Sequence, residues 1–171
     1  MKKKARPGDR TLQPDLFEED TVSSSSGERT TAVMHCDGAS SGNPGDSGIG
    51  AVIYPADKNF KIREGNEPVR VSNYIGSATN NIAEYTALIR GLRKAQQMAI
   101  KRIRIFLDSE LLVRQITGVY KVRNRNLMPL WTEATTLLKQ FDEWSINHIP
   151  REYNREADAL ARQGIRKKSI I

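Results

Sequence analysis

The sequence has little of what disulfide bonds, thiolate metal sites and membrane spans require. Cys36 is the one cysteine among 171 residues, which excludes an internal disulfide and a thiolate zinc site. No apolar stretch approaches the roughly 20 residues of a membrane-spanning helix, and no apolar segment follows the basic residues 2–4 as it would in a signal peptide. These absences predict a cytoplasmic protein that does not bind membranes.

Acidic residues are too few to balance the basic ones. The net charge is +7 and the isoelectric point is about 9.7. Residues 1–30 hold six basic and six acidic residues, so the excess, 21 basic against 14 acidic, lies in the rest of the chain. Such a surface favours nucleic acid as a partner, although a basic protein without that function could have the same composition.

The chain divides into a predicted disordered tail at residues 1–30 and one predicted folded domain at residues 31–168. The tail has mixed charge, a run of four serines and few apolar residues. In the rest, alternating and helical apolar periodicities follow one another in the order βββαβααβα. This order predicts an α/β domain with a mixed sheet. Strands are expected at 31–37, 48–54, 69–75, 103–107 and 144–149, and helices at about 80–99, 109–117, 129–141 and 154–166, with a turn at 38–45.

Four acidic residues stand where such a domain would bring them together. Asp37 and Asp108 end strands, Glu84 lies in the first turns of a helix, and Asp158 opens the last helix. If the two strands are parallel neighbours, their carboxyl ends meet at one edge of the sheet. Two carboxylates about 4 Å apart repel by roughly 4 kcal/mol at an effective dielectric constant near 20, so the cluster requires counter-charge. Hard divalent cations supply it; surface salt bridges or helix capping are the alternative.

The segments around these acids resemble the type 1 ribonuclease H family, in its reverse-transcriptase-like branch. The matching segments, in family order, are residues 37–45, 79–84, 107–110 and 154–161. The resemblance covers about residues 31–165. It implies a ribonuclease H-like α/β fold, with a five-stranded mixed sheet of order 3-2-1-4-5 and helices on both faces.

The resemblance implies a monomeric, metal-dependent endoribonuclease that cleaves the RNA strand of RNA·DNA hybrids and leaves 5′-phosphate and 3′-hydroxyl ends. Asp37, Glu84, Asp108 and Asp158 would be catalytic and would hold two Mg²⁺ ions, for which Mn²⁺ could substitute. In a two-metal site one ion activates water and the other stabilises the leaving oxygen.

Further residues match positions near the substrate in this family. Short amides can reach the 2′-hydroxyl groups that distinguish RNA from DNA, which suits Asn43, Asn80 and Asn81. Thr79 would help to hold a phosphate of the DNA strand. Caps and turns are the alternative role for these residues.

The chain departs from the family in two places. Many members have a histidine in a loop before the last acid, and this chain has none between Ile149 and Asn154. We expect slower turnover without it, with Glu152 or Arg155 as substitutes, and we interpret His35 and His148 as structural.

The second departure is the lack of a long basic protrusion. Lys121, Arg123 and Arg125 alone, beside Tyr120, are predicted to contact phosphate there. With so few contacts we expect weak binding with a shallow salt dependence. A solvated loop is the alternative.

The tail contains Gln13-Pro14-Asp15-Leu16-Phe17, which resembles the short peptide by which bacterial replication and repair proteins bind the sliding clamp. Chance occurrence is the alternative for so short a match.

Two other functions fit the same fold, namely a non-catalytic hybrid-binding module and a related nuclease acting on DNA or structured RNA. The full set of four acids argues against the pure binder, because negative charge beside phosphate would weaken its binding.

Overall fold

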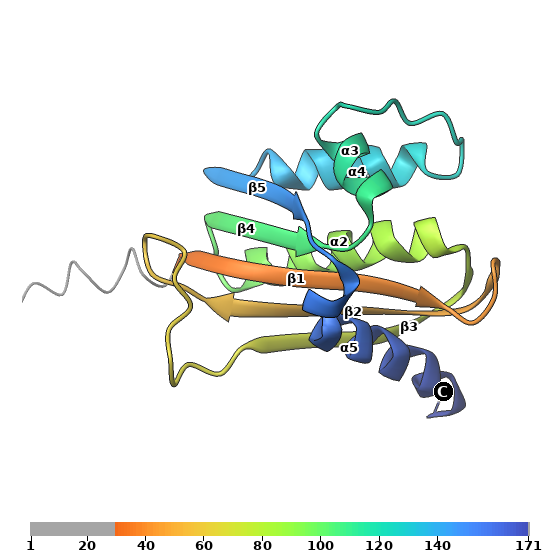
Figure 1. The fold of residues 1–171 in the computed structure, drawn as a ribbon, viewed down its shortest axis with the longest axis horizontal. Helices are drawn as coiled ribbons and strands as arrows, with labels where there is room; N and C mark the ends of the chain where they lie inside the picture. Colours follow the sequence, from red (N-terminus) through yellow and green to blue (C-terminus); the bar gives the residue numbers. More distant parts are fainter. Residues whose placement is uncertain (1–29, 171) are drawn as a thin grey trace, which may run out of the picture.

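Five strands form one mixed sheet in the order β3-β2-β1-β4-β5 in the computed structural model, which describes residues 30–170 (Figure 1). The predicted sliding-clamp peptide at residues 13–17 therefore lies outside the described residues. The first three strands are antiparallel, β4 runs parallel to β1, and β5 runs parallel to β4. This confirms the predicted fold class and strand order. The strands are β1 (Thr31–Ser40), β2 (Gly45–Pro55), β3 (Val69–Ala78), β4 (Arg102–Leu107) and β5 (Glu143–His148).

Helices cover both faces of the sheet, as predicted. α2 and α4 pack together on one face, and α5 crosses β2, β1 and β3 on the other (Figure 1). The helices are α2 (Asn80–Gln97), α3 (Glu110–Ile116), α4 (Met128–Leu138) and α5 (Arg155–Arg166), with short 3₁₀ segments η1 (Arg151–Tyr153) and η2 (Lys167–Ile170). Within residues 30–170, no helix combines the length and apolar character needed to cross a membrane.

The turn predicted at residues 38–45 is shorter than expected. β1 and β2 remain paired as far as Ser40 and Ser47, so that the strands continue past Asp37. The prediction was wrong because it took Gly38 as a turn residue. A Cβ atom at Gly38 would lie 2.2 Å from the carbonyl carbon of Ala83, so this glycine instead lets α2 approach β1 closely.

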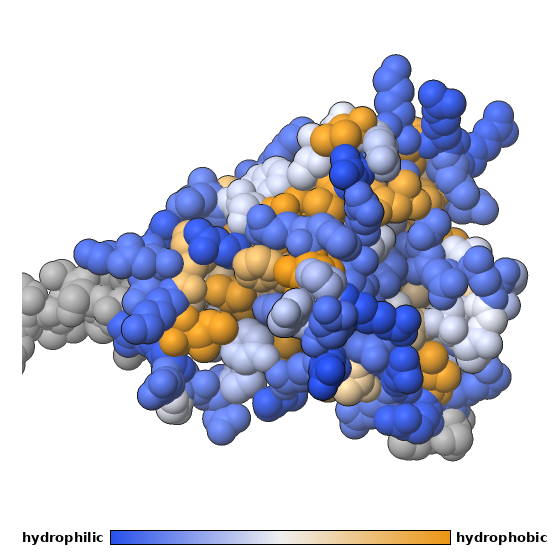
Figure 2. All heavy atoms as spheres, in the orientation of Figure 1, coloured by the Kyte–Doolittle hydropathy of each residue, from blue (hydrophilic) through white to orange (hydrophobic). Residues whose placement is uncertain are grey.

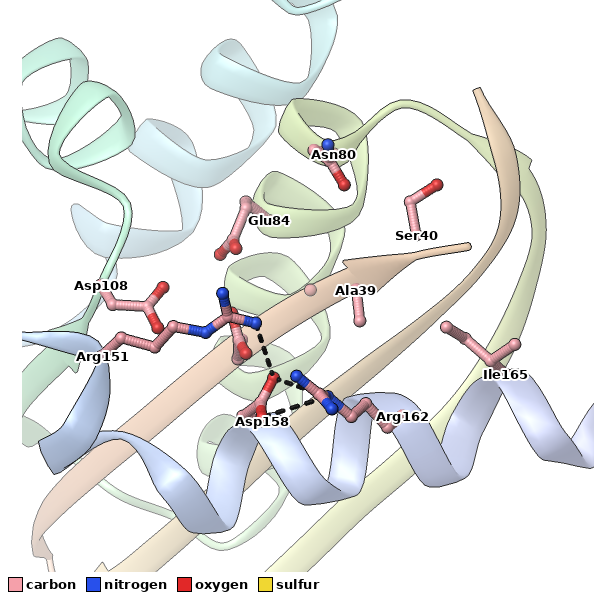
Figure 3. Close-up of a pocket in the computed structure, with 11 residues that line it drawn as sticks. Ala39, Ser40, Asn80, Glu84, Asp108, Arg151, Asp158, Arg162 and Ile165 are labelled. Carbon is pink, nitrogen blue, oxygen red and sulfur yellow. Dashed lines mark hydrogen bonds and ion pairs between the residues drawn. The ribbon is translucent and has the colours of Figure 1, made fainter. Parts of the chain in front are cut away.

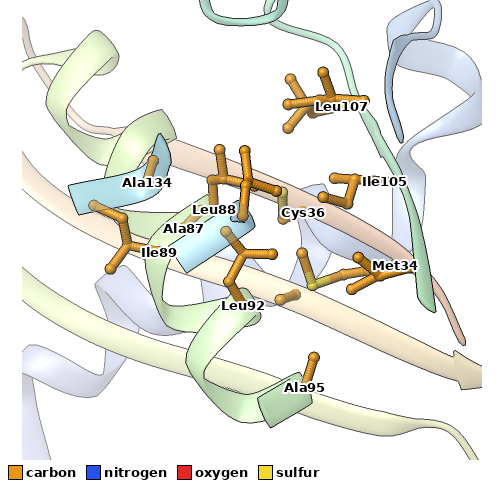
Figure 4. Close-up of a cluster of buried hydrophobic side chains, with 14 of the residues drawn as sticks. Met34, Cys36, Ala87, Leu88, Ile89, Leu92, Ala95, Ile105, Leu107 and Ala134 are labelled. Atoms are coloured by element: carbon orange, nitrogen blue, oxygen red, sulfur yellow. The ribbon is translucent and has the colours of Figure 1, made fainter. Parts of the chain in front are cut away.

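The main core lies between the sheet and α2 (Figure 4). Alternate residues of β1, among them Met34 and Cys36, meet the apolar stripe of α2, which includes Leu88 and Leu92. All four are at most 1% exposed, and each fully buried aliphatic side chain of this size stabilises the fold by about 1.5–3 kcal/mol. Cys36 is therefore a buried core residue.

The opposite face of the sheet receives α5 at very short range. A Cβ atom at Gly50 of β2 would lie 2.3 Å from the carbonyl oxygen of Ala157, so a larger residue would displace the helix. Close packing of α2 on β1 and of α5 on β2 determines where Glu84 and Asp158 emerge.

The surface is largely hydrophilic on the face drawn in Figure 2, with apolar patches between the charged groups. One patch lies over α3 and the connection from α3 to α4, where the exposed apolar side chains are Leu111, Val119, Tyr120 and Met128.

Candidate active site

A pocket of about 580 Å³ lies at the carboxyl ends of β1 and β4, between the start of α2 and the first turns of α5 (Figure 3). All four acids predicted to be catalytic line it. The lining residues are Asp37, Gly38, Ala39, Ser40, Asn80, Glu84, Asp108, Arg151, Asp158, Arg162 and Ile165.

The strand register brings Asp37 and Asp108 together. β1 and β4 pair in parallel from Thr31 beside Arg102 to His35 beside Phe106. Two residues further along both strands, the same register sets Asp37 beside Asp108. Two residues 71 positions apart in the sequence thereby become neighbours at one edge of the sheet.

Three of the four acids form a tight group. One carboxylate oxygen each from Asp37, Glu84 and Asp108 lies within 4.8 Å of the others. Asp158 lies in the same pocket, but its carboxylate faces two arginines. Its Oδ2 is 3.2 Å from Nε of Arg162, and its Oδ1 is 3.7 Å from Nη2 of Arg151. Figure 3 shows these ion pairs, with the side chain of Arg151 extending between Asp108 and Asp158.

Burial and mutual repulsion raise the pKa values of the acids in this group. Asp37 is 4% exposed, and desolvation raises its pKa to about 7, although a hydrogen bond with Glu84 acts in the opposite direction. Desolvation also raises the pKa of Glu84, and the charges of Asp37 and Asp108 raise it further. The pKa of Asp108 is raised by burial, while the charge of Arg151 opposes the shift. A positive ion would reverse these shifts, since it stabilises the ionised carboxylates.

Sequence reasoning missed Arg151 and Arg162 as pocket residues. The spacing of four residues between Asp158 and Arg162 is typical of an ion pair on one helix face and was a usable signal. Arg151 had no comparable signal. Glu152 and Arg155, the predicted substitutes for the loop histidine, do not line this pocket, and both are exposed.

The residues predicted to contact substrate near Glu84 lie at the start of α2. Thr79 caps the helix, since its hydroxyl accepts a hydrogen bond from the backbone N–H of Ile82 (3.2 Å). The side-chain oxygen of Asn43 accepts one from the backbone N–H of Asn80 (3.0 Å). Asn80 lines the pocket and Asn81 is exposed beside it. Thr79 and Asn43 thus make capping hydrogen bonds, which are compatible with the predicted substrate contacts, whereas the side chains of Asn80 and Asn81 make no cap.

The predicted basic contacts lie on the connection between α3 and α4. Lys121, Arg123 and Arg125 are exposed, and Arg114 lies 5.3 Å from the ring centre of Tyr120 at its base. None of them lines the pocket. Figure 1 draws this connection on the same side of the molecule as the start of α2.

Both histidines lie outside the pocket lining. His35 stacks on Phe106 with ring centres 5.2 Å apart, and burial lowers its pKa. His148 is exposed on β5, an edge strand. These positions agree with their interpretation as structural residues.

Known proteins are similar to this chain in sequence and in fold. The Reverse transcriptase-like family matches residues 35–164. The chain is 40% identical to Ribonuclease HI of Halobacterium salinarum over 129 residues, which cover 75% of this chain and 61% of that protein. It is 39% identical over 129 residues to Bifunctional protein Rv2228c of Mycobacterium tuberculosis, which cover 75% of this chain and 34% of that protein.

A solved structure of LC11-RNase H1 in complex with RNA/DNA hybrid superposes with a TM-score of 0.70 and 36% identity, covering 80% of this chain and 98% of that one. The chain thus spans about a third of the mycobacterial relative and less than two thirds of the halobacterial one, yet nearly all of the solved domain. On this evidence the chain belongs to the type 1 ribonuclease H family, within its reverse transcriptase-like group.

Proposed function

We propose that the protein is a metal-dependent endoribonuclease that cleaves the RNA strand of RNA·DNA hybrids and leaves 5′-phosphate and 3′-hydroxyl ends. The observation that carries the proposal is the pocket that gathers Asp37, Glu84, Asp108 and Asp158. Clustering Asp37, Glu84 and Asp108 costs repulsion energy that a bound cation would remove. The family membership and the hybrid bound to a structural relative support this substrate.

The donor set fits Mg²⁺, with Mn²⁺ as a substitute. Hard divalent cations take carboxylate oxygens as ligands, and the oxygens of Asp37, Glu84 and Asp108 are close enough to converge on one ion. Asp158 would complete a second position after release from Arg151 or Arg162. When bound, a pair of ions supplies an activated water and stabilises negative charge on the leaving oxygen.

The protein's own residues would orient the substrate around these acids. Asn80 and Asn81, at the start of α2, would contact the 2′-hydroxyl groups and base edges of the hybrid, with Asn43 beside them. The backbone N–H groups at this helix start, where Thr79 is the cap, favour a phosphate. Lys121, Arg123 and Arg125 would contact the phosphate backbone further away.

A substrate panel tests the proposal. Labelled RNA·DNA hybrid, duplex RNA, duplex DNA and single strands are incubated with the purified chain and Mg²⁺ or Mn²⁺. We expect cleavage of the RNA strand of the hybrid, with 5′-phosphate ends, and no cleavage with Asp108→Asn. Binding of hybrid without cleavage would instead indicate a binding module. Preferred cleavage of DNA or duplex RNA would indicate a related nuclease.

The peptide at residues 13–17 would bind a sliding clamp and bring the nuclease to replication sites in the cytoplasm. An apolar Leu16-Phe17 pair between charged residues suits a partner groove. Calorimetry with purified clamp tests this through Leu16→Ala combined with Phe17→Ala, which should abolish binding. Unchanged binding would exclude this peptide. A monomeric state, also predicted, is tested by light scattering on the same samples.

A further inference from the structure

Asn154 makes no use of the capping role for which asparagine is well suited. It immediately precedes α5, where asparagine is among the most favourable residues, yet its side chain makes no capping hydrogen bond. It is instead turned into the protein and is 1% exposed. A buried amide is costly unless its donor and acceptor are both satisfied.

The partners of this amide lie on β1, next to Asp37. Nδ2 of Asn154 donates to the backbone carbonyl of Cys36 (3.0 Å), and Oδ1 lies 3.3 Å from Nδ1 of His35. The Cys36 carbonyl belongs to the peptide unit that leads into Asp37. The hydrogen bond therefore restrains the backbone from which the Asp37 carboxylate projects.

Asn154 also contacts the other segments that bring charged groups into the pocket. The backbone carbonyl of Asn154 accepts from the N–H of Asp158 (3.1 Å), and its own N–H donates to the carbonyl of Arg151 (3.0 Å). One residue thus joins β1, η1 and α5.

We propose that Asn154 is a positioning residue that ties the β1 backbone at Asp37 to the start of α5, where Asp158 lies, and thereby sets the affinity for divalent metal. The inference rests on the proposed metal-dependent function. Like charges on separate segments repel one another, so the backbone that carries Asp37 has to be restrained if the carboxylates are to stay converged. Groups that orient metal ligands typically change metal affinity or activity by about 10- to 100-fold when removed.

The position of α5 as a whole does not depend on this amide. The helix is seated on β2 at Gly50, the hydroxyl of Ser72 donates to the carbonyl of Leu160 (2.7 Å), and Arg70 pairs with Glu156 (2.7 Å). Removal of the amide should therefore alter the pocket more than the fold. Ser72→Ala is the matched control, since it removes a bond between α5 and the sheet away from the acids.

The test is calorimetric titration of Mn²⁺ into the full chain, together with thermal unfolding. For Asn154→Ala we expect the Kd for Mn²⁺ to rise about 10- to 100-fold, whereas Ser72→Ala should keep the wild-type Kd despite a lower Tm. The Mg²⁺ concentration for half-maximal cleavage should shift by the same factor, and saturating Mg²⁺ should restore most of the rate. Asn154→Ser, which supplies a hydroxyl in place of the amide, should have an intermediate Kd for Mn²⁺. This variant carries the test if Asn154→Ala does not fold.

Two results would overturn the inference, and only the second would also overturn the proposed metal-dependent function. A wild-type Kd in Asn154→Ala, or in Asn154→Ser where that variant carries the test, would show that the amide acts on stability alone and would leave the nuclease function intact. Failure of the wild-type protein to bind Mn²⁺ at all would overturn the metal-dependent function together with the positioning role.

Discussion

Asp37 and Asp46 lie on neighbouring strands and have opposite electrostatic surroundings. Asp46 on β2 accepts hydrogen bonds from the Lys168 ammonium (2.9 Å) and the Tyr74 hydroxyl (2.8 Å), and the Lys168 bond in particular lowers its pKa. Asp37 on β1 has other acids as neighbours, and its pKa is raised to about 7. At Asp46 the fold supplies a cation of its own. At Asp37 the nearest charges are those of other acids, so this carboxylate suits a cation from solution.

Asp108→Asn should have the largest effect, because Asp108 belongs to the group of three acids whose oxygens could hold a metal ion. We expect hybrid cleavage to fall by about 1,000-fold, equivalent to roughly 4 kcal/mol of transition-state stabilisation. The metal-free variant should be at least as stable as the wild type, since one repulsive charge is gone. Single-turnover kinetics and thermal unfolding measure the two quantities. Full activity in Asp108→Asn would contradict the assignment of the pocket.

The stability of the metal-free protein should fall as pH rises. In the unfolded chain Asp37 releases its proton near the ordinary value of 3.8, whereas in the folded protein it keeps the proton up to about pH 7. The folded state therefore binds more protons in this window, and the free energy of unfolding decreases with rising pH between about 4 and 7. The contribution of Asp37 to this decrease should be on the order of 4 kcal/mol.

Thermal unfolding in EDTA across this pH range measures the decrease. Addition of Mg²⁺ above pH 7 should raise the Tm, because the ion binds only the folded state. Asp37→Asn is the control and should lose much of the pH dependence. A Tm that rises with pH in EDTA would contradict the raised pKa.

Replacing Lys121, Arg123 and Arg125 together by alanine should weaken binding and leave chemistry unchanged, since these side chains lie outside the acid pocket. We expect KM for hybrid to rise about 10-fold at constant kcat, and the salt dependence to become shallower by about 0.7–0.9 for each phosphate that the variant no longer neutralises. Cleavage assays over a range of salt concentrations measure both. A steep wild-type salt dependence that the triple variant retains would place the binding surface elsewhere.

Asp46→Asn should have the smallest effect, which makes it the direct counterpart of Asp108→Asn. The Asp46 pair with Lys168 is exposed, so its loss should change the cleavage rate by no more than about twofold and lower stability only slightly. The same kinetic and unfolding assays apply. A large loss of activity would mean that the two aspartates do not differ in role as their surroundings imply.

Much of the fold was predictable because its signals are local. Alternating apolar residues and the helical stripe of α2 located the elements, and glycine or polar residues marked most ends. The turn at residues 38–45 was predicted too long, because a glycine needed for close helix packing looks the same in the sequence as a glycine needed for a turn. Only the packing of α2 on Gly38 distinguishes them.

The sequence by itself determined that Asp37 and Asp108 could meet, since the carboxyl ends of neighbouring parallel strands lie at one edge of a sheet. It also determined the basic excess that a nucleic-acid partner requires. The tertiary structure alone decided that Arg151 and Arg162 face Asp158, and that Asn154 turns inward to β1 rather than capping α5. These choices depend on contacts between segments as much as 119 residues apart, and such contacts form only when the helices are packed on the sheet.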